Sequence, residues 1–377
     1  MTTLAHALDT KRILLCVGSG GVGKTTTAAA LAVEAARRGR RTAVLTVDPA
    51  PRLKDALGLS TLDARPRRVP LGAIGARGAH LDAVLLDVRR TFDELVTGLA
   101  STPEQARAVL ENRLYQNLSG TLTGTAEYMA VETVLRLAES GDYDLLVVDT
   151  PPSRHAVDFL DAPRRLLALL DSRAFSILKD PTSILPAGGS RLAHFVLGGV
   201  LRGLERFTGL ELVREVGDFV RAIETMTGAL RTRVAHVATL LREPSTMLLL
   251  VTAPEPRLVA ENERLGRSLA ALGLPTSGVI VNRMLPRTLF ASAGGPPADV
   301  APALAARLRR AHDELRTLAA RQEAALAPLV RTVGAPVVAE VPLVAGALGS
   351  LDDLAALARH LVPERAAEPA AARGRGR

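Results

Sequence analysis

Cysteine and tryptophan are nearly absent from this chain of 377 residues, which has one cysteine, Cys16, and no tryptophan. A single cysteine excludes a disulfide within the chain and a metal site built from several thiolates, so we expect no zinc site. Aromatic residues make up only 3% of the sequence. Because no basic block is interleaved with aromatic residues, we expect no nucleic-acid partner.

Long apolar segments are also missing. The run LAHFVLGGVL at 192–201 lies between Arg191 and Arg202 and has about half the length of a membrane-spanning helix. The N-terminal MTTLAHALDTKR lacks the pattern of a signal peptide. We therefore expect a cytoplasmic protein that is not integral to a membrane. The net charge of +8 fits solvated arginine-rich helices, or peripheral contact with anionic lipid.

The chain does contain short apolar runs that alternate with long helical patterns. We predict strands at 12–17, 42–47, 144–149, 246–252, 277–282 and 336–341, with a weaker candidate at 81–87. Helical patterns occupy 24–38, 125–140, 255–273 and 303–332. Continuous apolar runs are typical of strands that are covered on both faces. The alternation predicts an α/β fold with a doubly wound, mostly parallel sheet.

Two intervals, about 90–140 and 157–243, have helical patterns and no good strand. We interpret them as a helical subdomain inserted into a nucleotide-binding domain that spans 10–363. The basic tail, 364–377, has no packing pattern and is expected to be disordered.

Residues 18–25, GSGGVGKT, match the phosphate-binding pattern G-x-x-x-x-G-K-[ST]. The match follows a predicted strand and opens a predicted helix, as phosphate binding by backbone N–H groups requires. Lys24 is predicted to reach the β and γ phosphates of ATP, and Thr25 is predicted to place its hydroxyl on Mg²⁺. The expected nucleotide-binding residues of this loop are Gly20, Gly21, Val22, Gly23, Lys24, Thr25 and Thr26.

Polar residues end several of the predicted strands. Asp149 ends YDLLVVD and is predicted to hold Mg²⁺ in the manner of a Walker B acid. Asp48 ends an earlier strand, where it either activates water or caps the next helix; its spacing leaves both roles open. Asn282 ends a later strand, where its amide can bind adenine. Residues 150–155 would then form the switch that senses the γ-phosphate, and His155 in it reads more readily as structural than as catalytic.

Taken in order, these motifs resemble those of the arsenite-pump (ArsA-like, anion-transporting) ATPase family. The family includes the eukaryotic ATPases that target tail-anchored membrane proteins, and it belongs to the deviant-Walker P-loop group. The resemblance is carried by GSGGVGKTTTAAALA (18–32), VLTVDPAPRLKDALG (44–58), a stretch at 124–163 that contains DTPPSRH, and the segments 253–283 and 341–354.

The resemblance implies a dimer that opens and closes with ATP. By position, it implies that Asp48 is the water-activating switch I acid beside the metal and that Asp149 is the switch II acid. Asn282 would contact the adenine, and Pro342, in the loop 341–346, would form the other side of the base pocket.

Three positions depart from the family pattern. Ser19 stands where the family has a lysine that crosses the dimer to the partner's phosphates, a kind of contact worth on the order of 10³–10⁵ in rate. This predicts either slow hydrolysis by a homodimer or a heterodimer with a paralogous ArsA-like subunit that supplies the lysine. Arg154 either replaces the missing charge or is a surface arginine. The single Cys16 argues against metalloid transport.

Three functions therefore stay open. The first is a dimeric, ATP-hydrolysing ATPase that couples its nucleotide switch to a membrane-linked partner or client, working in the cytoplasm or peripherally at the membrane. The run 192–201 motivates this reading, although packing within the helical subdomain would also explain it. The second is a weakly catalytic regulatory subunit of a heterodimer, and the third is the ATPase subunit of an anion efflux pump.

Overall fold

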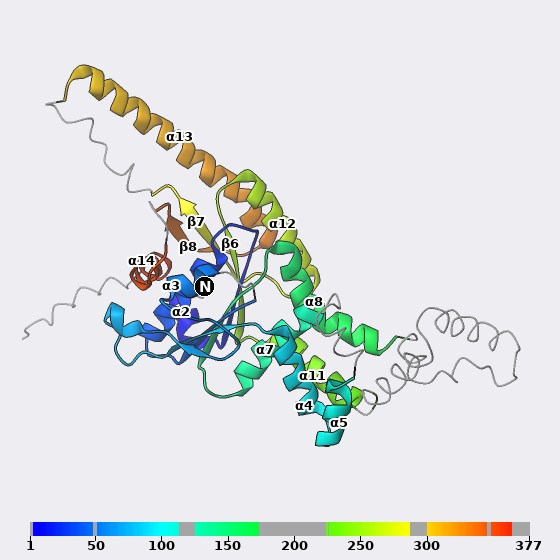
Figure 1. The fold of residues 1–377 in the computed structure, drawn as a ribbon. Helices are drawn as coiled ribbons and strands as arrows, with labels where there is room; N and C mark the ends of the chain where they lie inside the picture. Colours follow the sequence, from blue (N-terminus) through cyan, green and yellow to red (C-terminus); the bar gives the residue numbers. More distant parts are fainter. Residues whose placement is uncertain are drawn as a thin grey trace, which may run out of the picture. The chain divides into compact units, whose positions relative to one another are not determined.

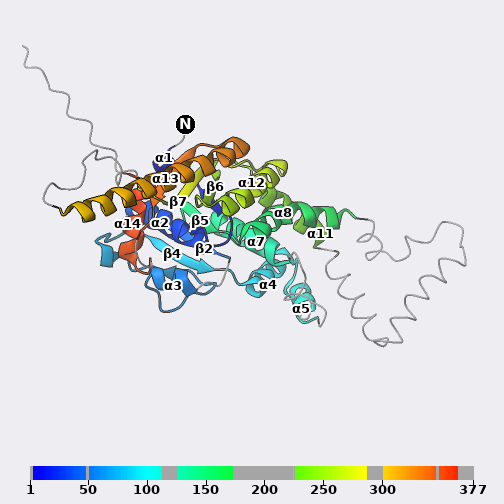
Figure 2. The same ribbon diagram turned by 90° about the horizontal axis from the view of Figure 1, so that it is seen from above.

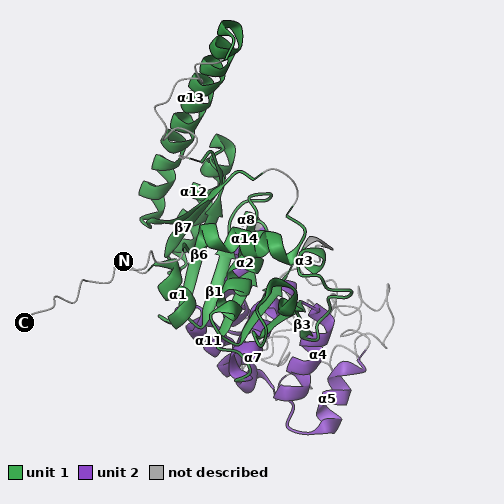
Figure 3. Cartoon of the chain, turned by 90° about the vertical axis from the view of Figure 1, so that its left-hand side faces the viewer, with its two compact units in different colours: residues 1–85, 141–154, 244–377 green, residues 86–140, 155–243 purple. Residues whose placement is uncertain are grey.

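The computed structural model describes residues 3–47, 51–112, 125–172, 224, 226–286, 300–344 and 348–363. Asp48, the apolar run 192–201 and the tail 364–377 lie outside the described residues, as do most of the interval 157–243 and the side chain of Arg154. The chain divides into two compact units (Figure 3). Unit 1 comprises Met1–Leu85, Gly141–Arg154 and Pro244–Arg377, and unit 2 comprises Leu86–Ser140 and His155–Glu243.

Unit 1 is built on one sheet. Within the described residues its strands are β1 (Ile13–Val17), β2 (Thr42–Thr46), β3 (Arg67–Arg68), β4 (Leu81–Leu85), β5 (Leu145–Asp149), β6 (Thr246–Thr252), β7 (Gly278–Met284) and β8 (Val337–Pro342). They lie in the order β3-β4-β2-β5-β1-β6-β7-β8. Every pairing is parallel except that of β3 with β4. The predicted α/β, mostly parallel sheet is confirmed; β3 was not foreseen, because two arginines carry no apolar pattern.

Helices cover both faces of this sheet. Those of unit 1 are α1 (Leu4–Thr10), α2 (Lys24–Arg37), α3 (Pro51–Ala56), α12 (Pro256–Ala271), α13 (Pro302–Val333) and α14 (Leu351–Leu361), with a 3₁₀ turn at Leu71–Ile74. The connection from β1 through α2 to β2 moves toward one edge of the sheet, and the connection from β6 through α12 to β7 moves toward the other edge. Because such crossovers are right-handed, α2 and α12 lie on opposite faces (Figure 1).

The core explains why these segments fold together. All of β1 is buried, and α2 buries a nearly continuous run of alanine, leucine and valine from Ala28 to Val33. Small alanine side chains let α2 pack closely on the sheet and on α14. On the other face α12 packs beside α13 (Figure 2). This packing fixes the carboxyl end of β1 and the start of α2, where the phosphate-binding motif lies.

Unit 2 is helical in the described residues. It contains α4 (Val88–Leu99), α5 (Pro103–Leu110), α7 (Thr125–Glu139), α11 (Thr227–Leu240) and all but the first residues of α8 (Ser153–Leu170). Two apolar clusters hold it, one around Val96 and Val109 and the other around Met129 and Val234. None of the helices described in the two units is long and apolar enough to cross a membrane.

An arginine that contacts one buried and one exposed carboxylate joins α7 to α11. The Arg233 guanidinium lies 2.7 Å from the Glu132 carboxylate and 2.5 Å from that of Glu139. Burial raises the pKa of Glu132, and the bonds from Arg233 oppose that rise. Loss of Arg233 would leave the buried Glu132 carboxylate without its compensating charge.

Candidate functional site

The phosphate-binding motif forms a tight loop between β1 and α2. The sheet order reverses here, since β2 lies on one side of β1 and β7 on the other, which is where open α/β sheets bind ligands. Gly18 has φ +154° and Gly23 has φ +94°, and a Cβ on them would overlap the Val251 carbonyl oxygen and the Asn282 amide, respectively. Gly20 and Gly21 expose their backbone. Glycine at 18 and 23 therefore lets the loop lie directly against the ends of β6 and β7 and form a cradle of exposed backbone.

Lys24 lies inside this cradle. Its side chain is buried, and its Nζ donates to the carbonyl oxygens of Gly18 at 3.0 Å and Ser19 at 2.8 Å. The ammonium group thus reaches back across the loop toward the place where phosphate oxygens bind in loops of this kind. The Lys24 ammonium group can therefore donate hydrogen bonds to phosphate oxygens that lose their water on binding.

A hydroxyl–carboxylate pair lies at the first turn of α2. Thr25 Oγ1 donates to Asp149 Oδ2 at 2.6 Å, and Thr46 Oγ1 donates to the same oxygen at 3.1 Å. Asp149 is almost fully buried at the end of β5, which pairs with both β1 and β2. The sheet register therefore brings Thr25, Thr46 and Asp149 together. Asp48, which follows β2, is outside the described residues.

Ser19 points into its own chain. It is fully buried, and Asn262 Oδ1 accepts from both the Ser19 backbone N–H at 2.9 Å and the Ser19 hydroxyl at 2.8 Å. Asn262, on α12 and also fully buried, donates through Nδ2 to the Val251 carbonyl oxygen at 3.3 Å. One amide thus ties the first half of the phosphate-binding loop to the end of β6.

The segment that follows Asp149 is bound to the same elements. Thr150 Oγ1 donates to the Cys16 carbonyl oxygen at 2.8 Å, and the Ser153 hydroxyl donates to Glu261, the neighbour of Asn262 on α12. Burial, with the nearby Asp149 charge, raises the pKa of the Cys16 thiol, so this cysteine is neutral near pH 7. Adjacent residues of α12 therefore contact both the loop and the predicted switch.

A cavity of about 520 Å³ opens beside the loop. Thr25 and Thr26 lie at one end of it, and an apolar wall from β8 and the segment after it forms the other end. Leu343 is 56% exposed and Val344 is 39% exposed in that wall. The lining residues are Gly23, Thr25, Thr26, Ala29, Leu53, Asp55, Ala56, Asn282, Arg283, Val341, Pro342, Leu343, Val344, Leu348, Gly349 and Leu357. A polar end joined to an open apolar end suits a nucleotide, with its phosphates in the loop and its base on the wall.

Asn282 and Arg283 are two of the polar residues that line this cavity. Asn282 Nδ2 donates to the Val22 carbonyl oxygen at 2.8 Å, and Asn282 Oδ1 accepts from the Arg283 N–H at 2.9 Å. Among the described residues other than glycine, only Arg283 has a positive φ, at 62°. Such backbone costs free energy and concentrates at functional sites. Here it aims an exposed arginine at the cavity rim.

The structure brings the residues predicted for the loop together with Asp149, Asn282 and Pro342. It leaves His155 exposed, in unit 2. Sequence reasoning missed Asn262 and Glu261. A signal for Asn262 was present, because a polar residue interrupts the apolar stripe that Val259, Leu265 and Leu269 form on α12.

The strand, glycine-rich loop and helix, with a buried lysine and a paired threonine and aspartate, define a P-loop nucleotide-binding protein. The sequence profile of the family described as "Anion-transporting ATPase" matches residues 11–292, and the chain belongs to this family of ATPases, as its motifs predicted.

Fungal relatives agree with this assignment. The chain is 28% identical over 287 residues to an ATPase GET3 of Chaetomium globosum, which covers 75% of this chain and 76% of the relative. It is 28% identical to an ATPase GET3 of Podospora anserina over the same shares of the two chains. It is 27% identical over 293 residues to an ATPase GET3 of Phaeosphaeria nodorum, over 75% and 80%. The chain is therefore an enzyme that binds and hydrolyses ATP.

Proposed function

We propose that this protein hydrolyses ATP with Mg²⁺ as part of a dimer, and that the nucleotide state controls a membrane-linked client. The contact between Thr25 and Asp149 carries the proposal. Its oxygens lie 2.6 Å apart, at the entrance of the phosphate-binding loop. A hydroxyl and a carboxylate placed this way are the protein groups that hold Mg²⁺ in P-loop enzymes.

The residues present fit that metal. In the described part of the chain no cluster of three or more His, Cys, Asp or Glu residues can enclose an ion. Mg²⁺ keeps several waters and takes only one or two protein ligands beside substrate phosphates, so Thr25 and Asp149 suffice. Bound Mg²⁺ would neutralise charge on the β and γ phosphates. Lys24 would stabilise the same charge from inside the loop, and Asp48 is proposed to orient the attacking water.

A second function is supported by the position of Ser19. A residue that is fully buried and bonded to Asn262 supplies no charge to a second subunit. This favours the weakly catalytic regulatory subunit, which would gain turnover from a paralogous subunit that carries a lysine at this position. An anion efflux pump would need an anion site, and Cys16, the one thiol of the chain, is buried in β1.

The test is ATP turnover by the purified full-length protein with and without Mg²⁺. We expect Asp149→Asn to lower turnover by about 10²–10³, in the range found when one transition-state contact is removed. Asp144→Asn is the matched control, because Asp144 precedes the same strand at its other end and pairs with Arg41. Asp48→Asn is expected to lower turnover with ATP binding retained.

The outcomes separate the two functions. Robust turnover by the lone protein that depends on Asp149 supports the ATPase and contradicts the regulatory subunit. ATP binding without turnover, followed by turnover when a paralogous ArsA-like subunit is added, supports the regulatory subunit. Stimulation by an oxyanion would instead support the efflux pump. Retention on detergent-solubilised membrane protein in one nucleotide state only is the expected result for a client, and equal retention in every state contradicts it.

A further inference from the structure

The two ends of α13 differ in how far their leucine side chains are covered. Near its C-terminus Leu326 and Leu329 are buried, and the helix lies against α12. Toward its N-terminus the leucine side chains are exposed by 40–47%; they are Leu304, Leu308, Leu315 and Leu318. Figure 1 shows this N-terminal part extending past β7 and β8. Isolated surface leucines are ordinary, but several on one helix face indicate a contact surface.

These leucines follow a coiled-coil repeat. Leu304, Leu308, Ala311, Leu315 and Leu318 are separated by alternating steps of four and three residues, which is the spacing of a and d positions in a heptad. The residues just before the a positions are Arg307 and Glu314. Such flanking positions carry the charges that decide partner and orientation in paired helices.

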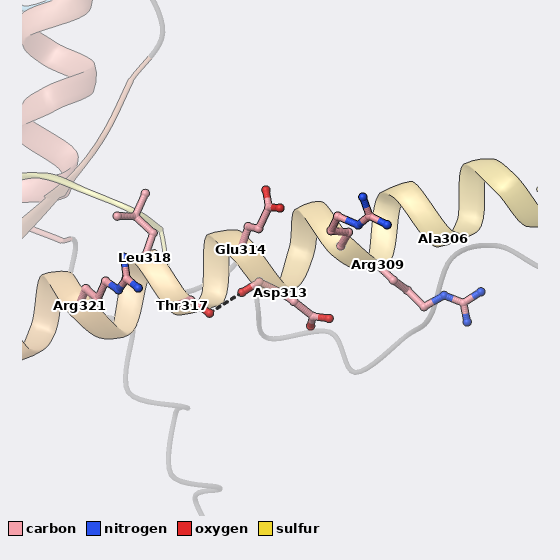
Figure 4. Close-up of a pocket in the computed structure, with 8 residues that line it drawn as sticks. Ala306, Arg309, Asp313, Glu314, Thr317, Leu318 and Arg321 are labelled. Atoms are coloured by element: carbon pink, nitrogen blue, oxygen red, sulfur yellow. Dashed lines mark hydrogen bonds between the residues drawn. The ribbon is translucent and has the colours of Figure 1, made fainter.

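The flanking charges complement each other in an antiparallel self-pairing. In an antiparallel pair of α13 helices centred between Leu308 and Ala311, Leu304 of each copy faces Leu315 of the other. The same register places Arg307 of each copy near Glu314 of the other. Both side chains are exposed, and neither forms an ion pair with any described residue. Figure 4 shows Glu314 on the same side of the helix as Leu318, along a hollow of about 730 Å³.

We propose that the N-terminal part of α13, from Leu304 to Leu318, is a docking surface for the same surface of a second copy of this chain. The contact is antiparallel and isologous, as in a two-fold dimer. It rests on the proposed function in one respect, which is that the ATPase works as a dimer. A second copy is the occupant because the leucine spacing and the Arg307–Glu314 pairing are self-complementary in one register.

The test is sedimentation equilibrium of the full-length protein with Mg²⁺ and a non-hydrolysable ATP analogue. Arg307→Glu and Glu314→Arg each place like charges opposite each other twice per dimer. Each is expected to raise the dimer dissociation constant at least ~10-fold, since like-charge contacts across an interface are strongly unfavourable. The double variant Arg307→Glu/Glu314→Arg restores opposite charges in the same register and is expected to recover the wild-type constant.

Two further variants sharpen the test. Arg316→Glu makes the same charge change at an exposed position of α13 that does not line this hollow, so it should leave the dissociation constant unchanged. Leu304→Ser/Leu315→Ser removes leucine contacts without charge and should weaken the dimer on the order of 100-fold. Circular dichroism and ATP binding check that each variant is folded.

The outcomes separate this inference from the proposed function. A wild-type dimer that no α13 variant weakens overturns the docking surface and leaves the dimeric ATPase standing. Failure of the double variant to recover overturns the antiparallel register. A wild-type protein that stays monomeric in every nucleotide state overturns the docking surface and the dimer together, while ATP turnover still tests the hydrolytic site by itself.

Discussion

The two ends of the nucleotide site are built on different principles. At the phosphate end Lys24 and Asp149 are buried, and their polar atoms contact Gly18, Ser19, Thr25 and Thr46 at 2.6–3.1 Å. At the end proposed for the base the wall is apolar, and more than half of Leu343 is exposed. The phosphate end is organised before any nucleotide binds, whereas a bound base would complete the packing of the other end.

This difference determines what each end can contribute. Preorganised charges and dipoles act on the transition state because they need no rearrangement during the reaction. An apolar wall binds the base equally in the ground state and the transition state, so it contributes to affinity alone. The substitutions below test this division, from the largest expected effect to the smallest.

Lys24→Ala should have the largest effect. Removing the buried ammonium group takes away the main positive charge at the phosphates, and we expect turnover to fall by at least ~10³. Steady-state ATPase assays measure this. Lys11→Ala is the control, since the Lys11 side chain is exposed and donates to the Pro244 carbonyl oxygen. A loss in turnover of less than tenfold would show that Lys24 is not part of the phosphate site.

Asn262→Ala should have an intermediate effect. It leaves the buried Ser19 N–H without its acceptor, which costs about 1–3 kcal/mol, and it leaves the hydroxyl only the longer contact with the Leu258 carbonyl oxygen at 3.4 Å. We expect a lower free energy of unfolding and a rise of about tenfold in KM for ATP, because the loop is less well held. Ser19→Ala, which removes only the hydroxyl, should be milder in both respects. Equal effects of the two variants, in denaturation and in KM, would contradict the role given to Asn262.

Leu343→Ala should change KM and leave kcat unchanged. Truncating a half-exposed leucine removes part of the surface on which the base packs, and we expect KM for ATP to rise by about 3–10-fold. Leu169→Ala is a matched control, because Leu169 is 55% exposed and lies in unit 2. A fall in kcat that equals the rise in KM would place Leu343 in the catalytic half of the site.

Arg283→Asn should have the smallest effect, and it should stabilise the protein where the other substitutions weaken activity or stability. The positive φ of Arg283 is costly for arginine and better tolerated by asparagine, so the unfolding free energy should rise by ~0.5 kcal/mol. Thermal denaturation of the nucleotide-free protein is the measurement. A fall in stability would mean that side-chain contacts of Arg283 outweigh the backbone strain.

Sequence and structure agree most closely where one short segment carries the information. The glycine-rich loop, Lys24, Thr25 and the strand that ends in Asp149 were predicted from their local patterns, because backbone turns and strand ends depend on neighbouring residues. Asn282 and Pro342 were assigned to the base pocket through the family resemblance, and the structure places both at the cavity beside the loop. Asn262 was missed, since Ser19 and Asn262 are 243 positions apart along the chain.

Ser19 illustrates the difference between what a residue type implies and what the fold decides. The residue type alone established that the lysine typical of the family is missing, and with it a charge that could cross to a partner. Only the tertiary structure decided that the serine turns inward, because α12 places a buried amide within hydrogen-bond distance of it. The sequence by itself determined the P-loop, the parallel sheet and the ATPase family, since these depend on local spacing. The fold decided the rest, because it depends on which distant segments pack together. This holds for the contact between Asn262 and Ser19, for the apolar wall around Leu343 and for the exposed leucines of α13.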